Sequence, residues 1–363
     1  MSRPSRSGGS PNPTPVTMPD SRADDAVSDA LPVAQDAGER YVLDREIGRG
    51  GMGRVFAGRD LRLQRTVAIK MLRVQDAALV TRFQREVRLG ARLQHPGVVP
   101  VYDAGFWSSG EPFLVMKLVL GQSLGRAVRD ADTSADRLAL LPNVIAAVEA
   151  VAYAHDQGVV HRDLKPTNVL VGAFGETIVV DWGLAKDLQA DVADQSEGVK
   201  SSAISPGNTG AGTVLGTPSY MPPEQAAGRP VDARADVYAL GAILYHVLAG
   251  TDPQPGSGDK AGDGSANGAA LVPVPRPLAT LEPRLPSDLL AIVEKAMASD
   301  PMARYPSAFE LGEDLKRFQA GQLVAARRYS PALRVVRSAG RHPLMVVAAL
   351  VAAALAILTL ASR

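Results

Sequence analysis

Short runs of apolar and β-branched residues fill the chain between residues 41 and 119. They read YVLDREIG, GRVFAGRD, TVAIKML, VVPVYDAGF and PFLVMKLV, and one helical stretch from about Thr81 to Gln94 separates them. Strand-forming residues in runs of this length predict a small antiparallel sheet that carries a single helix.

After Gly121 the apolar residues recur with helical spacing. The clearest predicted helices are Leu138 to Gln157, Asp232 to Ala249, Ser287 to Ala298 and Ser307 to Phe318. The change of period predicts two lobes of the α+β class, with strands first and helices second. Two irregular stretches, 187–215 and 251–287, interrupt the second lobe, and stretches of this length are usually functional or disordered.

The two ends of the chain differ in composition from its centre. Residues 1–38 are rich in Pro and Ser and contain no apolar signal segment, so we expect a disordered leader, with a short docking segment as the alternative. Residues 344–361 are 18 uncharged, mostly apolar residues, which is just long enough for one transmembrane helix. A buried terminal helix is the alternative, because alanine contributes little to insertion.

Positive charge lies before this apolar stretch. Five arginines precede it and only Arg363 follows, so the positive-inside rule predicts a single-pass protein of the cell membrane with its large N-terminal part in the cytoplasm. We divide the chain into the leader 1–38, a folded domain 39–320, a basic juxtamembrane segment 321–343 and the helix 344–361. We expect no extracellular sensor after this helix, unless the chain is part of a longer protein.

Overall charge and cysteine content exclude several classes of function. The formal net charge of +1 gives no reason to expect nucleic acid as a partner. The chain has no cysteine, which excludes a disulfide framework, a cysteine nucleophile and a cysteine-based metal site.

The segment IGRGGMGRVFAG places Gly48, Gly50 and Gly53 in GxGxxG spacing, followed by Val55. Glycines let the backbone approach a phosphate closely, and its free amides then bind the phosphate oxygens. The motif alone is weak, because a chain with 34 glycines can match it by chance. The flanking strands favour a hairpin that covers phosphates over the helix-opening turn of a dinucleotide site.

Two charged residues in the predicted first lobe suggest an ion pair. Lys70 ends the strand segment VAIK, where it could simply extend its amine to solvent, and Glu86 lies in the predicted helix, where it could be a solvated charge. Taken together, they suggest a lysine held against nucleotide phosphates by a carboxylate.

The segment HRDLKPTN concentrates polar side chains just before an apolar run. Asp163 could accept a proton from an attacking hydroxyl, Lys165 could neutralise a transferring phosphoryl group, and Asn168 could bind a metal. The segment VVDWG follows and places Asp181 at the end of another predicted strand, where its carboxylate could bind Mg²⁺.

In this order, these elements resemble the protein-kinase family over about residues 41–318, and in detail the membrane-anchored bacterial serine/threonine kinases of the eukaryotic (Hanks) type. The resemblance implies a bilobal kinase fold with a sheet lobe at 41–119 and a helical lobe at 120–320. It implies ATP and Mg²⁺ in the cleft, with Mn²⁺ as the alternative ion, Asp163 as the catalytic base, and a Lys70–Glu86 pair. Asn168 and Asp181 would hold the metal ions.

Further roles follow from the same resemblance. The segment GTPSYMPPEQ resembles the end of an activation segment, with Thr217 facing Asp163 and Lys165, which favours serine or threonine acceptors. Glu224 would pair with Arg304, and Asp236 would brace the catalytic loop. The residues expected to contact the nucleotide are Ile47, Gly48, Arg49, Gly50, Gly51, Gly53, Val55, Ala68, Lys70, Met116, Val119 and Asn168.

Two basic residues resemble positions that receive a phosphate from the activation loop, namely Arg162 and Lys186. The expected phosphate acceptors are Thr209 and Thr213, followed by Ser201, Ser202 and Ser205, and the alternative is that all are ordinary loop hydroxyls.

The sequence departs from the family at several positions. Trp182 replaces the usual Phe after the metal-binding Asp, and Gly90 stands where relatives carry a bulky helix residue, so we hypothesise that the indole fills the space beside Gly90. Lys117 stands where relatives often carry an acidic residue, so it should change the charge of the adenine pocket without loss of binding. Pro222 replaces the alanine before Pro223, and a non-helical segment should tolerate this change. The Gly-rich stretch 250–270 replaces a substrate-docking helix of relatives, which makes substrate recruitment the least transferable feature.

The residues therefore predict a non-specific serine/threonine protein kinase with protein substrates, which signals at the cytoplasmic membrane face. It would be activated by autophosphorylation, with homodimers allowing the reaction in trans. A pseudokinase scaffold is the alternative from another class, but every residue that the chemistry needs is present. A small-molecule phosphotransferase is less favoured.

Overall fold

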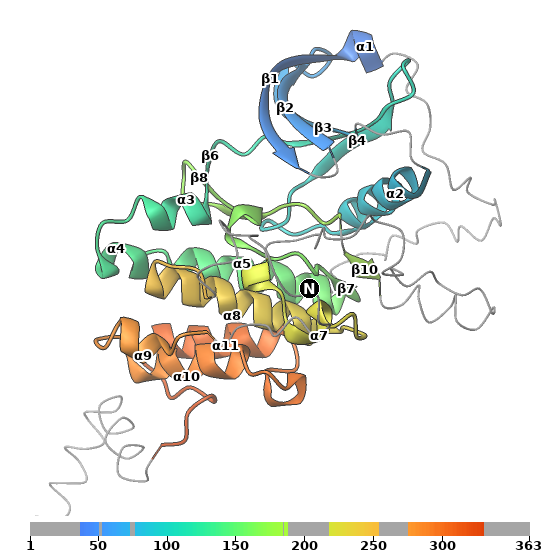
Figure 1. Ribbon diagram of the computed structural model, residues 1–363. Coiled ribbons are helices and arrows are strands. Elements are labelled where there is room, and N and C mark those ends of the chain that lie inside the picture. The colour runs from blue at the N-terminus through green and yellow to red at the C-terminus, as the bar shows by residue number, and fades with distance from the viewer. Residues whose placement is uncertain are drawn as a thin grey trace, which may run out of the picture.

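A computed structural model describes residues 37–50, 53–72, 77–183, 185–187, 218–253 and 275–329. The predicted leader up to residue 36, all of residues 188–217, and the predicted transmembrane helix lie outside these residues. The described residues form two stacked lobes, with a curved sheet and one long helix above a larger group of helices (Figure 1). The predicted bilobal fold is confirmed.

The first lobe is a five-stranded antiparallel sheet with the order β1-β2-β3-β5-β4. Its strands are β1 Tyr41–Gly50, β2 Gly53–Asp60, β3 Arg65–Leu72, β4 Val101–Phe106 and β5 Pro112–Lys117. The short helix α1, Ala37–Arg40, precedes the sheet. The long helix α2 covers Ala77–Arg92, so it begins four residues before the predicted start at Thr81.

Alternation along β3 decides which side chains face α2. Val67 and Ile69 are buried in a cluster on one face of the sheet, whereas Leu72 packs with Phe83 and Val87 of α2 on the other. Because successive side chains of a strand point to opposite faces, Lys70 lies on the same face as Leu72. The strand pattern therefore aims this lysine at α2.

The second lobe is mostly helical, as predicted. Its helices are α3 Leu124–Arg129, α4 Ser134–Leu138, α5 Leu141–Asp156, α7 Pro223–Ala226, α8 Ala233–Ala249, α9 Leu278–Leu281, α10 Ser287–Ala296 and α11 Ala308–Gln319. Its short strands are β6 Gly121–Ser123, β7 Val159–Val160, β8 Val169–Gly172, β9 Thr177–Val179 and β10 Lys186–Asp187. The helix predicted from Leu138 to Gln157 is α5, which starts three residues later than predicted with Pro142 in its first turn.

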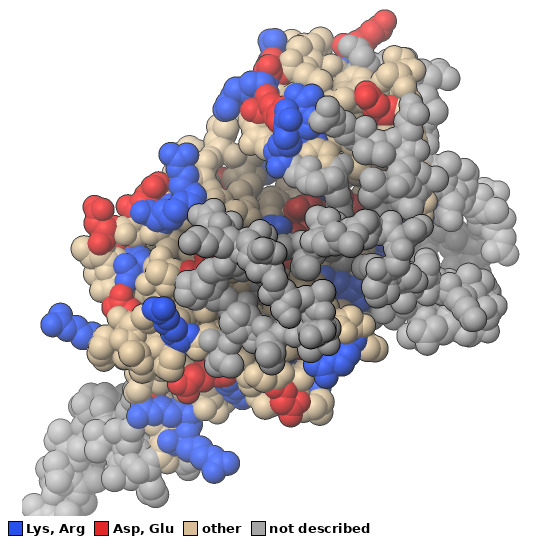
Figure 2. Space-filling model, in the orientation of Figure 1, with Lys and Arg blue, Asp and Glu red and all other residues tan. Residues whose placement is uncertain are grey.

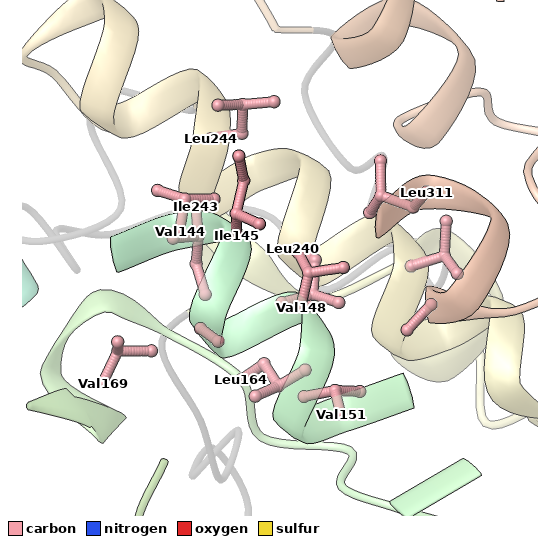
Figure 3. Close-up of a cluster of buried hydrophobic side chains, with 14 of the residues drawn as sticks. Val144, Ile145, Val148, Val151, Leu164, Val169, Leu240, Ile243, Leu244 and Leu311 are labelled. Atoms are coloured by element: carbon pink, nitrogen blue, oxygen red, sulfur yellow. The ribbon is translucent and has the colours of Figure 1, made fainter. Parts of the chain in front are cut away.

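The core of this lobe lies where α5, α8 and α11 meet (Figure 3). Val144 and Val148 of α5 face Leu240 and Ile243 of α8, and Leu311 of α11 joins them. The α8 helix is apolar on all sides, which is typical of a helix buried at the centre of a domain. Asp232 caps its start, and Gly250 ends it in the left-handed conformation with a φ of 73°.

Within the described residues, one segment is long and apolar enough to cross a membrane, and it is Ser134–Asp156 with a mean hydropathy of 1.5. It comprises α4 and α5, and the apolar face of α5 packs inside the helical lobe. Its hydrophobicity is therefore that of a core helix.

The folded part continues past residue 320, where the sequence analysis ends the domain. Asp314 of α11 is fully buried and accepts hydrogen bonds from the backbone N–H groups of Ala325 and Ala326 at 2.6 and 2.8 Å. Tyr329 is 8% exposed, and Arg327 forms a 2.9 Å ion pair with Asp288. The start of the predicted juxtamembrane segment is thus packed against the helical lobe.

Candidate active site

A buried lysine connects the two lobes. Lys70 of β3 is 8% exposed, and its Nζ lies 2.6 Å from Oε1 of Glu86 and 2.9 Å from Oδ1 of Asp181. Burial disfavours the charged amine, but the two carboxylates outweigh it and raise the pKa of Lys70 above its ordinary value. The predicted pair with Glu86 is therefore formed, and the lysine carries its positive charge at neutral pH.

The carboxylate of Asp181 lies at the end of the β8–β9 hairpin. Burial opposes its charge, and the neighbouring Lys70 lowers its pKa below the ordinary value. Its backbone has a φ of 65°, which is uncommon for a residue other than glycine. Uncommon backbone conformations of this kind cluster at functional sites, because the surrounding structure must hold them.

The loop between β7 and β8 brings the predicted catalytic residues together. Nζ of Lys165 donates to Oδ2 of Asp163 at 2.7 Å, and Nδ2 of Asn168 donates to the carbonyl oxygen of Asp163 at 2.8 Å. A carbonyl oxygen can only accept, so the amide nitrogen of Asn168 must face Asp163 and its Oδ1 lies on the other side. That oxygen is a suitable ligand for a hard metal ion.

Asp236 of α8 braces this loop, as predicted. Its carboxylate accepts hydrogen bonds from the backbone N–H groups of His161 at 2.7 Å and Arg162 at 2.8 Å. Its Oδ2 also lies 2.9 Å from Nε2 of His155 in α5. Burial opposes the charge, but the bond from His155 and those from the backbone keep the pKa of Asp236 below its ordinary value.

The ring of Trp182 lies against His161, with ring centroids 4.6 Å apart and ring planes tilted by 49°. The idea that this indole fills the space beside Gly90 is wrong. A Cβ at position 90 would meet Cγ2 of Val101 in β4 at 2.9 Å and no side chain from Trp182 within 4 Å. Val101 occupies that space, which the sequence did not suggest.

The glycine-rich segment is the hairpin between β1 and β2. Gly48 is paired with Val55, and Gly50 with Gly53. A Cβ on Gly53 would lie 2.1 Å from the carbonyl oxygen of Met71, so this glycine is needed for packing against β3, whatever it does for a phosphate.

The other residues predicted to contact the nucleotide lie on neighbouring strands. Ala68 is buried in β3 and is paired with Met116 of β5, while Val119 and Met116 are half-buried against the core of the helical lobe. Ile47 is 40% exposed beside the glycines. Gly51 lies outside the described residues, and Arg49 forms a surface ion pair with Glu46.

The predicted regulatory residues are described only in part. Arg162 has a φ of 68°, burial lowers its pKa, and its Nε has no hydrogen-bond partner within the described residues. The backbone of Lys186 pairs with Val160. Thr209, Thr213 and Thr217 lie outside the described residues, as do Ser201, Ser202 and Ser205.

The segment after the activation loop is fixed to the helical lobe by the predicted ion pair. Nη1 and Nη2 of Arg304 lie 2.7 and 2.9 Å from the two carboxylate oxygens of Glu224 in α7. The sequence analysis missed Gln225, the next residue, whose Nε2 donates to the carbonyl oxygen of Arg162 at 2.8 Å. Only its position beside Glu224 could have drawn attention to it.

This arrangement of a lysine pair, a catalytic loop and a braced activation segment defines a class of protein. Residues 41–313 match the family described as the protein kinase domain, and the chain belongs to this family.

Particular relatives agree with this assignment. The serine/threonine-protein kinase PknB of Mycobacterium tuberculosis is 38% identical over 291 residues, which are 78% of this chain and 44% of that protein. A probable serine/threonine-protein kinase PknB of Bifidobacterium longum is 34% identical over 84% of this chain and 43% of its own length. The chain thus spans less than half the length of these curated relatives.

A solved structure shows the same fold. The PknI kinase domain of Mycobacterium tuberculosis superposes with a TM-score of 0.56 at 26% sequence identity, over 80% of this chain and 99% of that domain.

Proposed function

We propose that the protein is a serine/threonine protein kinase that transfers the γ-phosphoryl group of ATP to hydroxyl groups of protein substrates. The observation that carries the proposal is the joint placement of Asp163, Lys165 and Asn168 on one loop with Asp181 held by Lys70. A carboxylate, two amines and two metal-binding oxygens then lie where the two lobes meet, at the hollow between them in the space-filling view (Figure 2). Phosphoryl transfer uses these groups: a base, positive charges beside the phosphates, and ligands for a metal ion.

Each residue has a separate task in the reaction. The carboxylate of Asp163 accepts the proton of the attacking substrate hydroxyl. The hydroxyl oxygen bonds to the γ-phosphorus, and the bond between that phosphorus and the ADP oxygen breaks. Lys165, which already lies 2.7 Å from Asp163, neutralises charge on the moving phosphoryl group. Lys70 stays protonated and binds the phosphates that remain on ADP, oriented by Glu86.

The residues fit a divalent ion. Asn168 directs its amide oxygen away from Asp163, and Asp181 offers a carboxylate of low pKa. Mg²⁺ is usually bound by one or two protein side chains together with substrate phosphates, and this pair of oxygen ligands fits that mode. When bound, Mg²⁺ would offset the negative charge of the phosphates. Mn²⁺ is the alternative ion.

Regulation by phosphorylation of the activation loop is part of the proposal. The half-buried guanidinium of Arg162 lacks a hydrogen-bond partner for its Nε within the described residues, and a phosphate on Thr209 or Thr213 would supply one. Mass spectrometry of the active protein should find phosphate between residues 184 and 216. Finding none would remove this part of the proposal.

We also propose that residues 344–361 anchor the kinase to the cell membrane as a single helix, with the domain in the cytoplasm and homodimers phosphorylating each other in trans. The support is the uncharged stretch and the arginines before it. The test is cell fractionation of the whole chain beside a chain that ends at residue 340. Equal amounts of both in the soluble fraction would contradict the anchor.

The test of the function itself is a transfer assay. Incubated with labelled ATP, Mg²⁺ and a basic test protein, the chain should yield labelled phosphoserine or phosphothreonine and no phosphotyrosine. The pseudokinase alternative predicts no label. Label on tyrosine alone would contradict the proposed acceptor class.

A further inference from the structure

Arg162 is held in an uncommon conformation directly before the proposed catalytic base. Its φ of 68° lies in the left-handed region, which a residue with a side chain adopts only at a cost in free energy. Its N–H donates to Asp236 at 2.8 Å, and its carbonyl oxygen accepts from Nε2 of Gln225 at 2.8 Å. Side chains from α8 and α7 therefore hold the backbone of Arg162 on both sides of its Cα atom.

Gln225 is well placed to act as a fixed clamp. Its neighbour in α7, Glu224, is 5% exposed and tied to Arg304 by two short contacts. The α7 helix therefore cannot shift without breaking a buried ion pair. Gln225 transmits this fixed position to the carbonyl group of Arg162.

The amide group of Gln225 is not explained by stability. Because the carbonyl oxygen of Arg162 can only accept, Nε2 must face it. Oε1 of Gln225 is then buried and has no hydrogen-bond partner within the described residues. A buried unpaired amide oxygen destabilises a fold, and an apolar side chain of the same size would avoid that cost while losing only the bond to Arg162.

The clamp lies beside the chemistry. Gln225 and Arg162 line the same small cavity as Asp163 and Lys165. Asp163 is joined to Arg162 by a peptide bond, so a rotation of the Arg162 carbonyl group would redirect the backbone that carries the base. A displacement of about 1 Å at such a group can lower a rate by about a hundredfold.

We propose that Gln225 is a positioning residue for phosphoryl transfer: its amide holds Arg162 in the left-handed conformation that aims the carboxylate of Asp163 at the acceptor hydroxyl. The fixed position of α7, at the end of the activation segment, thereby restricts the backbone before Asp163 through one hydrogen bond. The inference deepens the proposed kinase function and rests on it.

The test compares the full-length chain with Gln225→Met and Gln225→His. Methionine keeps the size of glutamine and removes both polar atoms, whereas the imidazole N–H of histidine restores a donor. We expect kcat to be about tenfold lower in Gln225→Met, with the KM for ATP changed less than about twofold. The Tm should change little, because the variant removes the unpaired Oε1 but also leaves the carbonyl oxygen of Arg162 without its donor. Gln225→His should recover part of kcat. Hydrogen exchange of the amides in residues 161–165 should be faster in Gln225→Met.

The outcomes separate this inference from the proposed function. An active wild-type chain with equal kcat in Gln225→Met would overturn the clamp, and so would a lower kcat accompanied by a lower Tm and no recovery in Gln225→His, which indicates a structural role only. An inactive wild-type chain would contradict the proposed function. Hydrogen exchange then still tests whether Gln225 holds Arg162, because equal exchange of residues 161–165 in the wild type and Gln225→Met would overturn that role.

Discussion

Arg304 and Glu224 form a buried, bidentate ion pair although they are 80 residues apart in the sequence. The side chain of Arg304 is 0% exposed, and its remaining N–H groups donate to the carbonyl oxygens of Ala298, Arg234 and Ser299. All five donors of the guanidinium are thereby used. The pair fixes α7, and with it the end of the activation segment, to the base of the helical lobe.

Removing one partner of this pair should destabilise the protein strongly. Glu224→Ala or Arg304→Ala leaves an unpaired buried charge, so we expect the free energy of unfolding to fall by about 3 to 5 kcal/mol. The matched control is Arg126→Ala, because Arg126 pairs with Asp130 on the surface, with side chains 67% and 55% exposed. That change should cost less than about 1 kcal/mol. Denaturant unfolding measures both, and equal losses would refute the assigned role.

Gly90 should be coupled to Val101 and not to Trp182. Gly90→Leu introduces a side chain whose Cβ alone meets Val101 at 2.9 Å, so we expect a loss of about 1 to 3 kcal/mol from overpacking. Val101→Ala in the same chain should recover most of this loss, whereas Trp182→Phe should not. Double-mutant cycles on unfolding free energies measure both couplings. A larger coupling with Trp182 would restore the hypothesis that the sequence suggested.

Asp314 should control the docking of the segment after α11. Its carboxylate accepts from Tyr305 at 2.8 Å and from two backbone N–H groups of the segment. Asp314→Ala leaves these donors unpaired, so trypsin should cut after Arg327 and Arg328 at least about tenfold faster, which is an opening free energy lower by about 1.4 kcal/mol. The control is Glu313→Ala, since the side chain of Glu313 is 39% exposed. Equal cleavage of the two variants would show that Asp314 does not hold the segment.

His246 should make stability depend on pH. It is 7% exposed in α8, and Tyr220 and Asp252 lie beside it. Burial lowers the pKa of His246, and Asp252 only partly offsets this. The unfolded chain therefore takes up a proton near pH 6.5 that the folded chain resists, so this contribution to stability is complete above about pH 6.5 and is lost as the pH falls.

The measurement for His246 is the Tm from about pH 7.5 down to about pH 5.5. His246→Gln should flatten the decline of the Tm at low pH. His95→Gln removes a histidine outside this cluster and should leave the decline as it is. An unchanged slope in His246→Gln would show that another group causes the decline.

The sequence predicted those parts of the fold and site that depend on local pattern. The period-two alternation of β3 places Lys70 on the face that packs against α2, and the apolar sequence of α8 marks it as the central helix. The motifs predicted the pairs of Lys70 with Glu86 and of Glu224 with Arg304, because each partner has a fixed place in the family.

Contacts without a local pattern were not predicted. Val101 fills the space at Gly90 because β4 packs on α2, which no spacing in either element reveals. The bond from Gln225 to Arg162 depends on how α7 is placed by Glu224. The domain end was set too early because the bonds that hold the backbone after α11 come from a buried carboxylate, and no local pattern reveals them.

The central claim is that Asp163 acts as the base in ATP-dependent phosphorylation of protein hydroxyls. The most direct measurement is the steady-state rate of phosphate transfer from ATP to a basic test protein, for the wild type and for Asp163→Asn. We predict a kcat at least about a hundredfold lower in the variant, with little change in the KM for ATP, because the amide cannot accept the proton but keeps the size of the carboxylate. Equal kcat values for the two proteins, or no transfer by the wild type, would contradict the account.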